Sequence, residues 1–185
     1  MLRVSCCWPS SPLSPVWRRG AHYLFAAFFL ATLPFPTTFV RADVIGEAHV
    51  IDGDTLQVAG ERVRLQGIDA PETRQSCSVA GIGYACGQNA KRLLAGATAG
   101  KIITCKGEKR DRYGRLVAVC FAGEDDLNAM MVRDGWALAY RRYGRDYVPE
   151  EAEARAVGAG LWQGTFVEPW EWRKHAREAS TEAQR

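Results

Sequence analysis

The chain of 185 residues is long enough for one domain with a substantial core and too short for two domains of ordinary size. Its 24 Lys and Arg residues against 21 Asp and Glu residues leave a net charge of only +3 at pH 7. This balance excludes the strongly basic proteins that bind nucleic acids through overall charge, so any affinity for phosphate must come from a local group of residues.

Residues 1–42 differ in composition from the rest of the chain. They contain four Arg residues, no acidic residue, and an apolar stretch at 23–33 that is much shorter than the about 20 residues of a membrane-spanning helix. Val40 and Ala42 are small residues of the kind that a signal peptidase recognises. We expect 1–42 to be a signal peptide, with an uncleaved membrane anchor as the alternative, and the mature protein to be periplasmic or secreted.

Short strands joined by tight turns dominate the chain that follows. Turn sequences at Asp52-Gly53-Asp54 and Ala59-Gly60 separate the first three of them. The expected strands are residues 44–51, 55–58, 63–68, 102–106 and 116–121. A Gly-rich loop with Gly81, Gly83 and Gly87 follows the third strand.

Helices are expected between and after these strands, at residues 88–95, 127–134 and 149–157. Gly135 and Gly158 end the last two. After Trp172 the charged, Ala- and Ser-rich sequence predicts a disordered tail. The pattern therefore predicts an α+β domain at 43–172, built on a small, partly closed β-barrel, and a tail at 173–185.

Four cysteines remain once residues 1–42 are removed, and their spacing matches no zinc site. In an oxidising compartment an even number of cysteines indicates disulfides. Cys77 and Cys86 lie in one loop, whereas Cys105 and Cys120 lie in consecutive strands. Of the three possible pairings, we expect Cys77–Cys86 and Cys105–Cys120.

Three segments carry side chains suited to one kind of chemistry: residues 52–55, 64–73 and 111–115. Each alone is equally well explained as an ordinary turn. Together they supply aspartates on separate loops, which suit a hard, oxygen-seeking cation such as Ca²⁺. They also supply a glutamate able to take a proton from water and arginines able to bind a phosphate. This set indicates a phosphodiesterase.

The order D-G-D-T, R-x4-D-x-P-E-T and D-x-Y-G-R resembles the staphylococcal nuclease family, and the similarity extends over about residues 48–162. The resemblance implies a five-stranded oligonucleotide-binding barrel with about three helices. It also implies a calcium-dependent endonuclease that cuts DNA and RNA by in-line attack of water and leaves 3′-phosphate ends.

The resemblance further implies a role for individual residues of the three segments. Asp54 and Asp69 would bind calcium together with the main-chain carbonyl of Ala70, where the family often has threonine. Asp52 would lie in the outer shell of the metal.

Glu72 corresponds to the family's general base, and Arg64 and Arg115 correspond to its phosphate-binding arginines. Tyr113 and Tyr140 would lie near the bound nucleotide, although the sequence around Tyr140 departs from the family's spacing.

Two alternatives stay open from the sequence. Arg62 shares a strand face with Arg64, and only the spacing between Arg64 and Asp69 favours Arg64 as the phosphate ligand. A non-catalytic module that binds nucleic acid or protein is the second candidate function, and a structural protein of the cell envelope is a third. We expect DNA and RNA as substrates, no protein partner, a monomer, and membrane contact only if residues 1–42 stay uncleaved.

Overall fold

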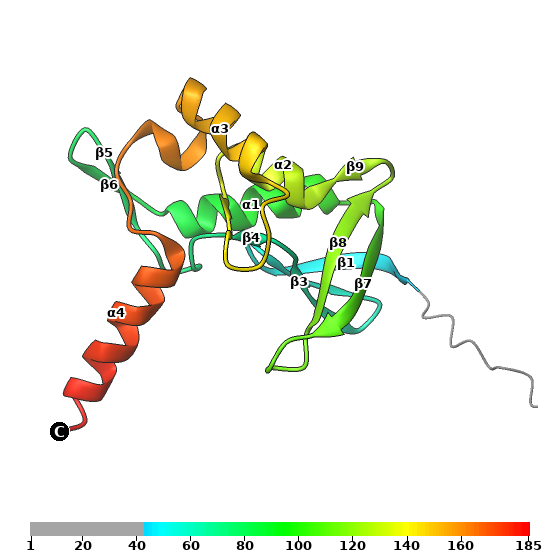
Figure 1. Ribbon diagram of the computed structural model, residues 1–185, viewed down its shortest axis with the longest axis horizontal. Coiled ribbons are helices and arrows are strands. Elements are labelled where there is room, and N and C mark those ends of the chain that lie inside the picture. Colours follow the sequence, from blue (N-terminus) through cyan, green and yellow to red (C-terminus); the bar gives the residue numbers. More distant parts are fainter. Residues whose placement is uncertain (1–42) are drawn as a thin grey trace, which may run out of the picture. The chain divides into compact units, whose positions relative to one another are not determined.

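Five β-strands form a closed barrel in the computed structural model, which describes residues 43–185 (Figure 1). The strands are β1 (Val44–Asp52), β2 (Thr55–Val58), β3 (Glu61–Leu65), β7 (Ile102–Arg110) and β8 (Leu116–Ala122). They follow the order β3-β2-β1-β7-β8, and parallel pairing of β3 with β8, with Val63 opposite Leu116, closes the barrel. The predicted α+β barrel is confirmed. The expected signal segment lies outside the described residues.

Four α-helices and one short 3₁₀-helix accompany the barrel within the described residues. They are α1 (Cys86–Thr98), α2 (Leu127–Arg133), α3 (Val148–Val157), η1 (Gly160–Gln163) and α4 (Pro169–Glu182). Asp126 caps the start of α2, and its carboxylate accepts hydrogen bonds from the N–H groups of Asn128 and Ala129. Gly158, with φ of 64°, caps the end of α3. Helix α1 packs against β1 and α2.

The expected disordered tail is wrong for residues 173–182, because they continue helix α4. Pro169 stands at the first helical position, where its fixed φ and missing N–H favour a helix start, and it is buried. Residues 169–173 of α4 lie against the rest of the domain: Pro169 is buried, and Arg173 bonds to Asp69 and Glu72. From Lys174 onward the helix is exposed, and it extends away from the barrel (Figure 1).

Short strands shape the loops beside the barrel. β4 (Ile68–Asp69) pairs with β10 (Leu138–Ala139), and β9 (Asp125–Asp126) extends the sheet beyond β8. The expected Gly-rich loop instead contains a hairpin of β5 (Cys77–Val79) and β6 (Ile82–Tyr84). Ala80 and Gly81 both have positive φ, as a two-residue hairpin turn requires.

Both expected disulfides are present. Cys77 and Cys86 join the β5–β6 hairpin to the start of α1, and Cys105 and Cys120 join opposite positions of β7 and β8 inside the core. The barrel interior around the second bond is filled by fully buried apolar side chains, among them Leu56, Leu65 and Ile103.

None of the helices between residues 43 and 185 is long and apolar enough to cross a membrane.

Candidate active site

Asp54 and Asp69 lie beside each other in the folded chain. Asp54 stands in the turn before β2, and Asp69 ends β4. The N–H of Ala70 donates to Oδ2 of Asp54 at 3.0 Å, and the N–H of Leu65 donates to the carbonyl oxygen of Asp54 at 2.9 Å. Asp54 is 5% exposed and Asp69 is fully buried. Two buried carboxylates require positive charge nearby.

Arg64 on β3 supplies that charge. Its Nη1 forms an ion pair with Oδ2 of Asp54, and its Nη2 donates to Oδ1 of Asp69 at 2.6 Å. Burial opposes the charge of the guanidinium, but the two carboxylates outweigh burial and raise the pKa of Arg64. Burial likewise opposes the charge of Asp54, and Arg64 outweighs it and lowers the pKa of Asp54. Arg62 is exposed, so Arg64 is the arginine that contacts the aspartates.

Glu72 lies in a loop that the chain holds on both sides. The N–H of Gln75 donates to the carbonyl oxygen of Glu72 at 2.7 Å, and the N–H of Glu72 donates to Oε1 of Gln75 at 3.3 Å. Gln75 is 1% exposed. The start of α1 lies so close that a Cβ added at Gly87 would overlap the carbonyl oxygen of Glu72. The loop that carries Glu72 is therefore tightly packed.

Asp52 connects the first aspartate turn to the Glu72 loop. Its Oδ1 accepts hydrogen bonds from the N–H of Gly53 at 2.8 Å and from the hydroxyl of Thr73 at 3.0 Å. Burial, and then the negative charge of Asp54, raise the pKa of Asp52 to about 6. Asp52 thus lies next to Asp54 and the Glu72 loop, and it makes no ion pair with Arg64.

Arg115 reaches the same group of residues from the turn between β7 and β8. Its Nε donates to Oδ2 of Asp111 at 2.7 Å, and its Nη1 donates to the hydroxyl of Thr55 at 3.2 Å. The Thr55 hydroxyl in turn donates to Oδ1 of Asp54 at 3.0 Å. Burial would raise the pKa of Asp111, but its hydrogen bonds with Arg115 outweigh burial and lower it. Arg115 is therefore linked to Asp54 through one hydroxyl group.

The two predicted tyrosines lie in different surroundings. Tyr113 is 69% exposed at the tip of the β7–β8 turn, with the guanidinium of Arg115 at 5.5 Å from its ring centre. Tyr140 directly follows β10, which pairs with β4 and its Asp69. The ring of Tyr140 stacks on Trp170 of α4, with 5.5 Å between ring centres and 9° between ring planes.

Arg173 is a site residue that the sequence analysis missed. Its Nη1 donates to Oδ1 of Asp69 at 3.0 Å and to Oε1 of Glu72 at 2.8 Å, and its Nη2 donates to Oδ2 of Asp69 at 2.7 Å. Burial opposes the charge of Arg173, but Asp69 and Glu72 outweigh it and raise its pKa. Pro169 ahead of a charged, Ala-containing stretch was the available signal for the helix that carries it.

The donor set at Asp54, Asp69 and the Ala70 carbonyl fits a calcium ion in its chemistry. All the donors are oxygens, and water can fill the remaining positions of a cation with six to eight ligands. A carboxylate offers about four lone-pair positions. Asp69 accepts three hydrogen bonds from Arg64 and Arg173, so about one position is left for a cation. Asp54 has three partners as well, Thr55, Ala70 and Arg64. Within residues 43–185, no three His, Cys, Asp or Glu side chains are grouped to hold a metal ion. The expected site does not require three, because its third ligand is a carbonyl.

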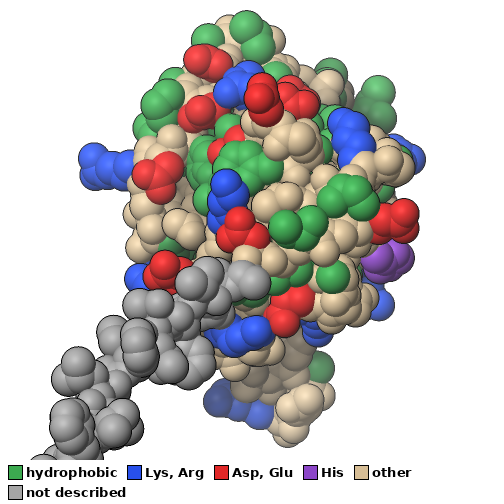
Figure 2. Space-filling view, turned by 90° about the vertical axis from the view of Figure 1, so that its right-hand side faces the viewer, with side chains coloured by type: hydrophobic (Ala, Val, Ile, Leu, Met, Phe, Trp, Pro, Cys, Tyr) green, Lys and Arg blue, Asp and Glu red, His purple; other side chains and the backbone are tan. Residues whose placement is uncertain are grey.

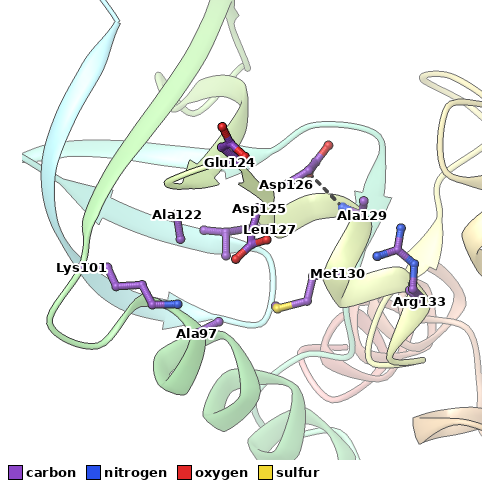
Figure 3. A pocket seen from close by; sticks show the side chains of 10 residues that line it. All are labelled: Ala97, Lys101, Ala122, Glu124, Asp125, Asp126, Leu127, Ala129, Met130 and Arg133. Carbon is purple, nitrogen blue, oxygen red and sulfur yellow. Dashed lines mark hydrogen bonds between the residues drawn. The ribbon is translucent and has the colours of Figure 1, made fainter.

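A cavity of about 480 Å³ involves a different part of the chain, between α1, β9 and α2 (Figure 3). Its charged lining residues are Lys101, Glu124, Asp125, Asp126 and Arg133. None of these is an expected site residue, and the carboxylate of Asp126 already accepts hydrogen bonds at the start of α2. The cavity is therefore separate from the candidate active site.

Known proteins with similar sequences include nucleases. A family model described as staphylococcal nuclease homologue matches residues 62–164, which contain all the candidate site residues except Asp52, Asp54 and Arg173. The chain is 37% identical to the micrococcal nuclease of Shigella flexneri over 158 residues, which are 75% of this chain and 86% of that one.

Two further relatives carry other names. Protein ParB of Escherichia coli is 36% identical over 184 residues, with 89% of this chain and 98% of the relative covered. The succinoglycan biosynthesis protein ExoI of Rhizobium meliloti is 40% identical over 124 residues, which cover 65% of each chain.

Proposed function

We propose, from the premise that this chain belongs to the staphylococcal nuclease family, that it is a calcium-dependent endonuclease that hydrolyses DNA and RNA. Membership of the family makes the chain a hydrolase of nucleic acids. The metal, the residue roles and the position of the cut are the parts that we propose.

The observation that carries the proposal is the hydrogen-bonded cluster of the five expected residues. Arg64 contacts both Asp54 and Asp69. Arg115 is linked to Asp54 through the hydroxyl of Thr55. Glu72 and Asp69 both accept a hydrogen bond from Nη1 of Arg173. Carboxylates, a base and two arginines so close together are the groups that hydrolysis of a phosphodiester requires.

Each group has a proposed role that follows from its chemistry. Glu72 accepts a proton from the attacking water as the oxygen of that water bonds to phosphorus. Arg64 and Arg115 bind the phosphate oxygens and offset the charge that builds on them. The bond from phosphorus to the 5′ oxygen breaks, so the phosphate stays on the 3′ end. Tyr113 and Tyr140 offer aromatic faces to the nucleotide.

Calcium would be held by Asp54, Asp69 and the carbonyl oxygen of Ala70. When bound, it would supply a positive charge that polarises the phosphoryl group and offsets its negative charge. Asp52, next to Asp54, would hydrogen-bond water in the outer shell of the metal.

Affinity for nucleic acid would be local to this cluster. The face shown in Figure 2 has basic and acidic side chains interspersed over it, with no field of one sign. The composition of residues 43–185 agrees with that distribution: without the four Arg residues of 1–42, 20 of the 24 Lys and Arg remain against 21 Asp and Glu. Substrate binding would therefore depend on a few phosphate contacts near the cluster and on the exposed aromatic rings.

Export of the protein is part of the proposal. Two disulfides are typical of an oxidising compartment. We propose that residues 1–42 direct export and are removed near Asp43. Intact-mass measurement on protein from its native host would then lack that segment, whereas a full-length mass in the membrane fraction would indicate an anchor.

Product analysis with a matched variant tests the proposed chemistry. Labelled single- and double-stranded DNA and RNA are incubated with the purified protein and with Glu72→Gln, and the product ends are identified. Internal cuts with 3′-phosphate ends, strongly slowed in the variant, are expected. Binding without cleavage would favour the non-catalytic module, and 5′-phosphate ends would contradict the proposed bond cleavage.

A further inference from the structure

Arg173 makes the closest side-chain contact of the proposed general base. Among residues 43–185, it is the one side chain that pairs with the Glu72 carboxylate, through Nη1 and Oε1 at 2.8 Å. The same Nη1 donates to Oδ1 of Asp69 at 3.0 Å, and Nη2 donates to Oδ2 of Asp69 at 2.7 Å. One planar group therefore fixes the position of Glu72 relative to a fully buried aspartate.

The backbone that carries Arg173 is itself anchored. Pro169 is buried, and Trp170 stacks on Tyr140, which follows the strand paired with β4. Just before α4, the side-chain amide of Gln75 donates to the carbonyl oxygen of Val167 at 2.6 Å. These contacts place the first turn of α4 against the loops of the site. The backbone from which Arg173 extends to Glu72 is therefore fixed relative to the domain.

The contact leaves one oxygen of Glu72 available. Arg173 bonds only to Oε1, and no other described side chain bonds to Oε2. A carboxylate held by one oxygen keeps its direction and can still accept a proton at the other. Because a general base must lie within hydrogen-bond reach of the proton that it takes, a fixed direction matters for rate.

We propose that Arg173 is a positioning residue that holds Glu72 in place for catalysis. The proposal rests on the proposed role of Glu72 as general base. Helix α4 is then part of the active site, although it lies beyond residues 62–164 that the family model matches. Loss of the contact would let the Glu72 carboxylate rotate, and a displacement of about 1 Å can cost about 100-fold in rate.

Steady-state cleavage measured over a range of substrate concentrations at saturating calcium tests this role. Arg173→Ala should lower turnover by about 10- to 100-fold with little change in KM, and Arg173→Lys should recover part of the loss because it keeps the charge. Lys174→Ala, one position later on the same helix and exposed, is the matched control and should cleave normally. Normal turnover in Arg173→Ala would overturn the proposal.

A double variant separates positioning from other roles. If Arg173 acts through Glu72, adding Arg173→Ala to Glu72→Gln should cost less than threefold further. An equal loss in both backgrounds would overturn the proposal, because it would mean direct contact with the phosphate or a general loss of structure. Higher turnover in Arg173→Ala would overturn it as well, since Arg173 would then compete with the metal.

Calcium titration by calorimetry adds a measurement that does not depend on activity. Removal of the guanidinium takes a positive charge away from Asp69, so calcium should bind to Arg173→Ala at least as tightly as to the wild type. Weaker calcium binding in Arg173→Ala would overturn the positioning role. Normal cleavage by Glu72→Gln would instead contradict the proposed function itself, whatever the result for Arg173→Ala.

Discussion

The main-chain N–H of Ala70 donates a hydrogen bond of 3.0 Å to Oδ2 of Asp54, a residue 16 positions earlier in the chain. The bond joins the end of β4 to the turn between β1 and β2. It places the proposed carbonyl ligand of calcium and one proposed carboxylate ligand on adjacent segments, with Arg64 bonded to that carboxylate and to Asp69. A small barrel thereby brings distant parts of the sequence into one site.

Substitution of Asp69 and of Glu72 should affect calcium affinity and turnover differently, because the two carboxylates have different proposed roles. Asp69→Asn removes charge from a proposed metal ligand, so both calcium affinity and turnover should fall. Glu72→Gln keeps the size and polarity of the side chain but cannot accept the proton. It should lower turnover by about 10²- to 10⁴-fold while calcium affinity changes little. Calorimetric titration beside single-turnover kinetics makes the comparison, and equal loss of calcium affinity in both variants would contradict the separation.

The two arginines of β3 provide a matched pair for the phosphate contact. Arg64→Lys keeps the positive charge between the buried aspartates but loses the two-pronged geometry, so turnover should fall by about 10²- to 10³-fold. Arg62→Lys changes an exposed side chain and should alter turnover by less than about twofold. Rates measured under saturating calcium decide between them. If Arg62→Lys is the damaging change, the assignment of the motif to Arg64 is wrong.

Two glycines of α1 should respond in opposite directions to the same change. A Cβ at Gly87 would overlap the carbonyl oxygen of Glu72, so Gly87→Ala should displace that loop, lower stability by about 1–3 kcal/mol and slow cleavage. Gly96 lies in the same helix with open space around it, so Gly96→Ala should raise stability by about 0.5–1 kcal/mol and leave cleavage unchanged. Denaturant unfolding and cleavage rates test both, and normal cleavage by Gly87→Ala would contradict the close packing.

The bond between Cys105 and Cys120 should matter for stability rather than chemistry. It closes a segment of 15 positions, and a disulfide that closes a loop of about this length contributes about 3 kcal/mol in the chain-entropy model. Replacement of both cysteines by Ala should lower the free energy of unfolding by about 2–4 kcal/mol with little effect on turnover at low temperature. Equal stability of the variant and the wild type would contradict this expectation, and non-reducing peptide mapping checks the pairing.

The strands of the barrel were predictable because their β-branched residues and turn sequences are local signals. Strand periodicity left the choice between Arg62 and Arg64 open, since both side chains lie on one face of β3. The spacing between Arg64 and Asp69 in the motif favoured Arg64, and in the folded chain Arg64 is the one that contacts Asp54 and Asp69.

Helix α4 and its site contact through Arg173 were not predicted, for physical reasons. Its sequence is charged and lacks a continuous apolar face, so composition favours disorder. The contacts that hold its first turn come from distant residues, as Trp170 does against Tyr140. Arg173 pairs with Asp69 across 104 positions of sequence. A hydrogen bond over that distance leaves no periodic signal in the chain.

Cleavage of labelled DNA and RNA measured against free calcium tests the central claim most directly. The all-oxygen set at Asp54, Asp69 and Ala70 predicts half-maximal rate at about 10⁻⁴–10⁻³ M calcium, the range of extracellular calcium sites. Activity should vanish in excess chelator and return when calcium is restored. Full activity in chelator, or a strict requirement for zinc, would contradict the proposed site.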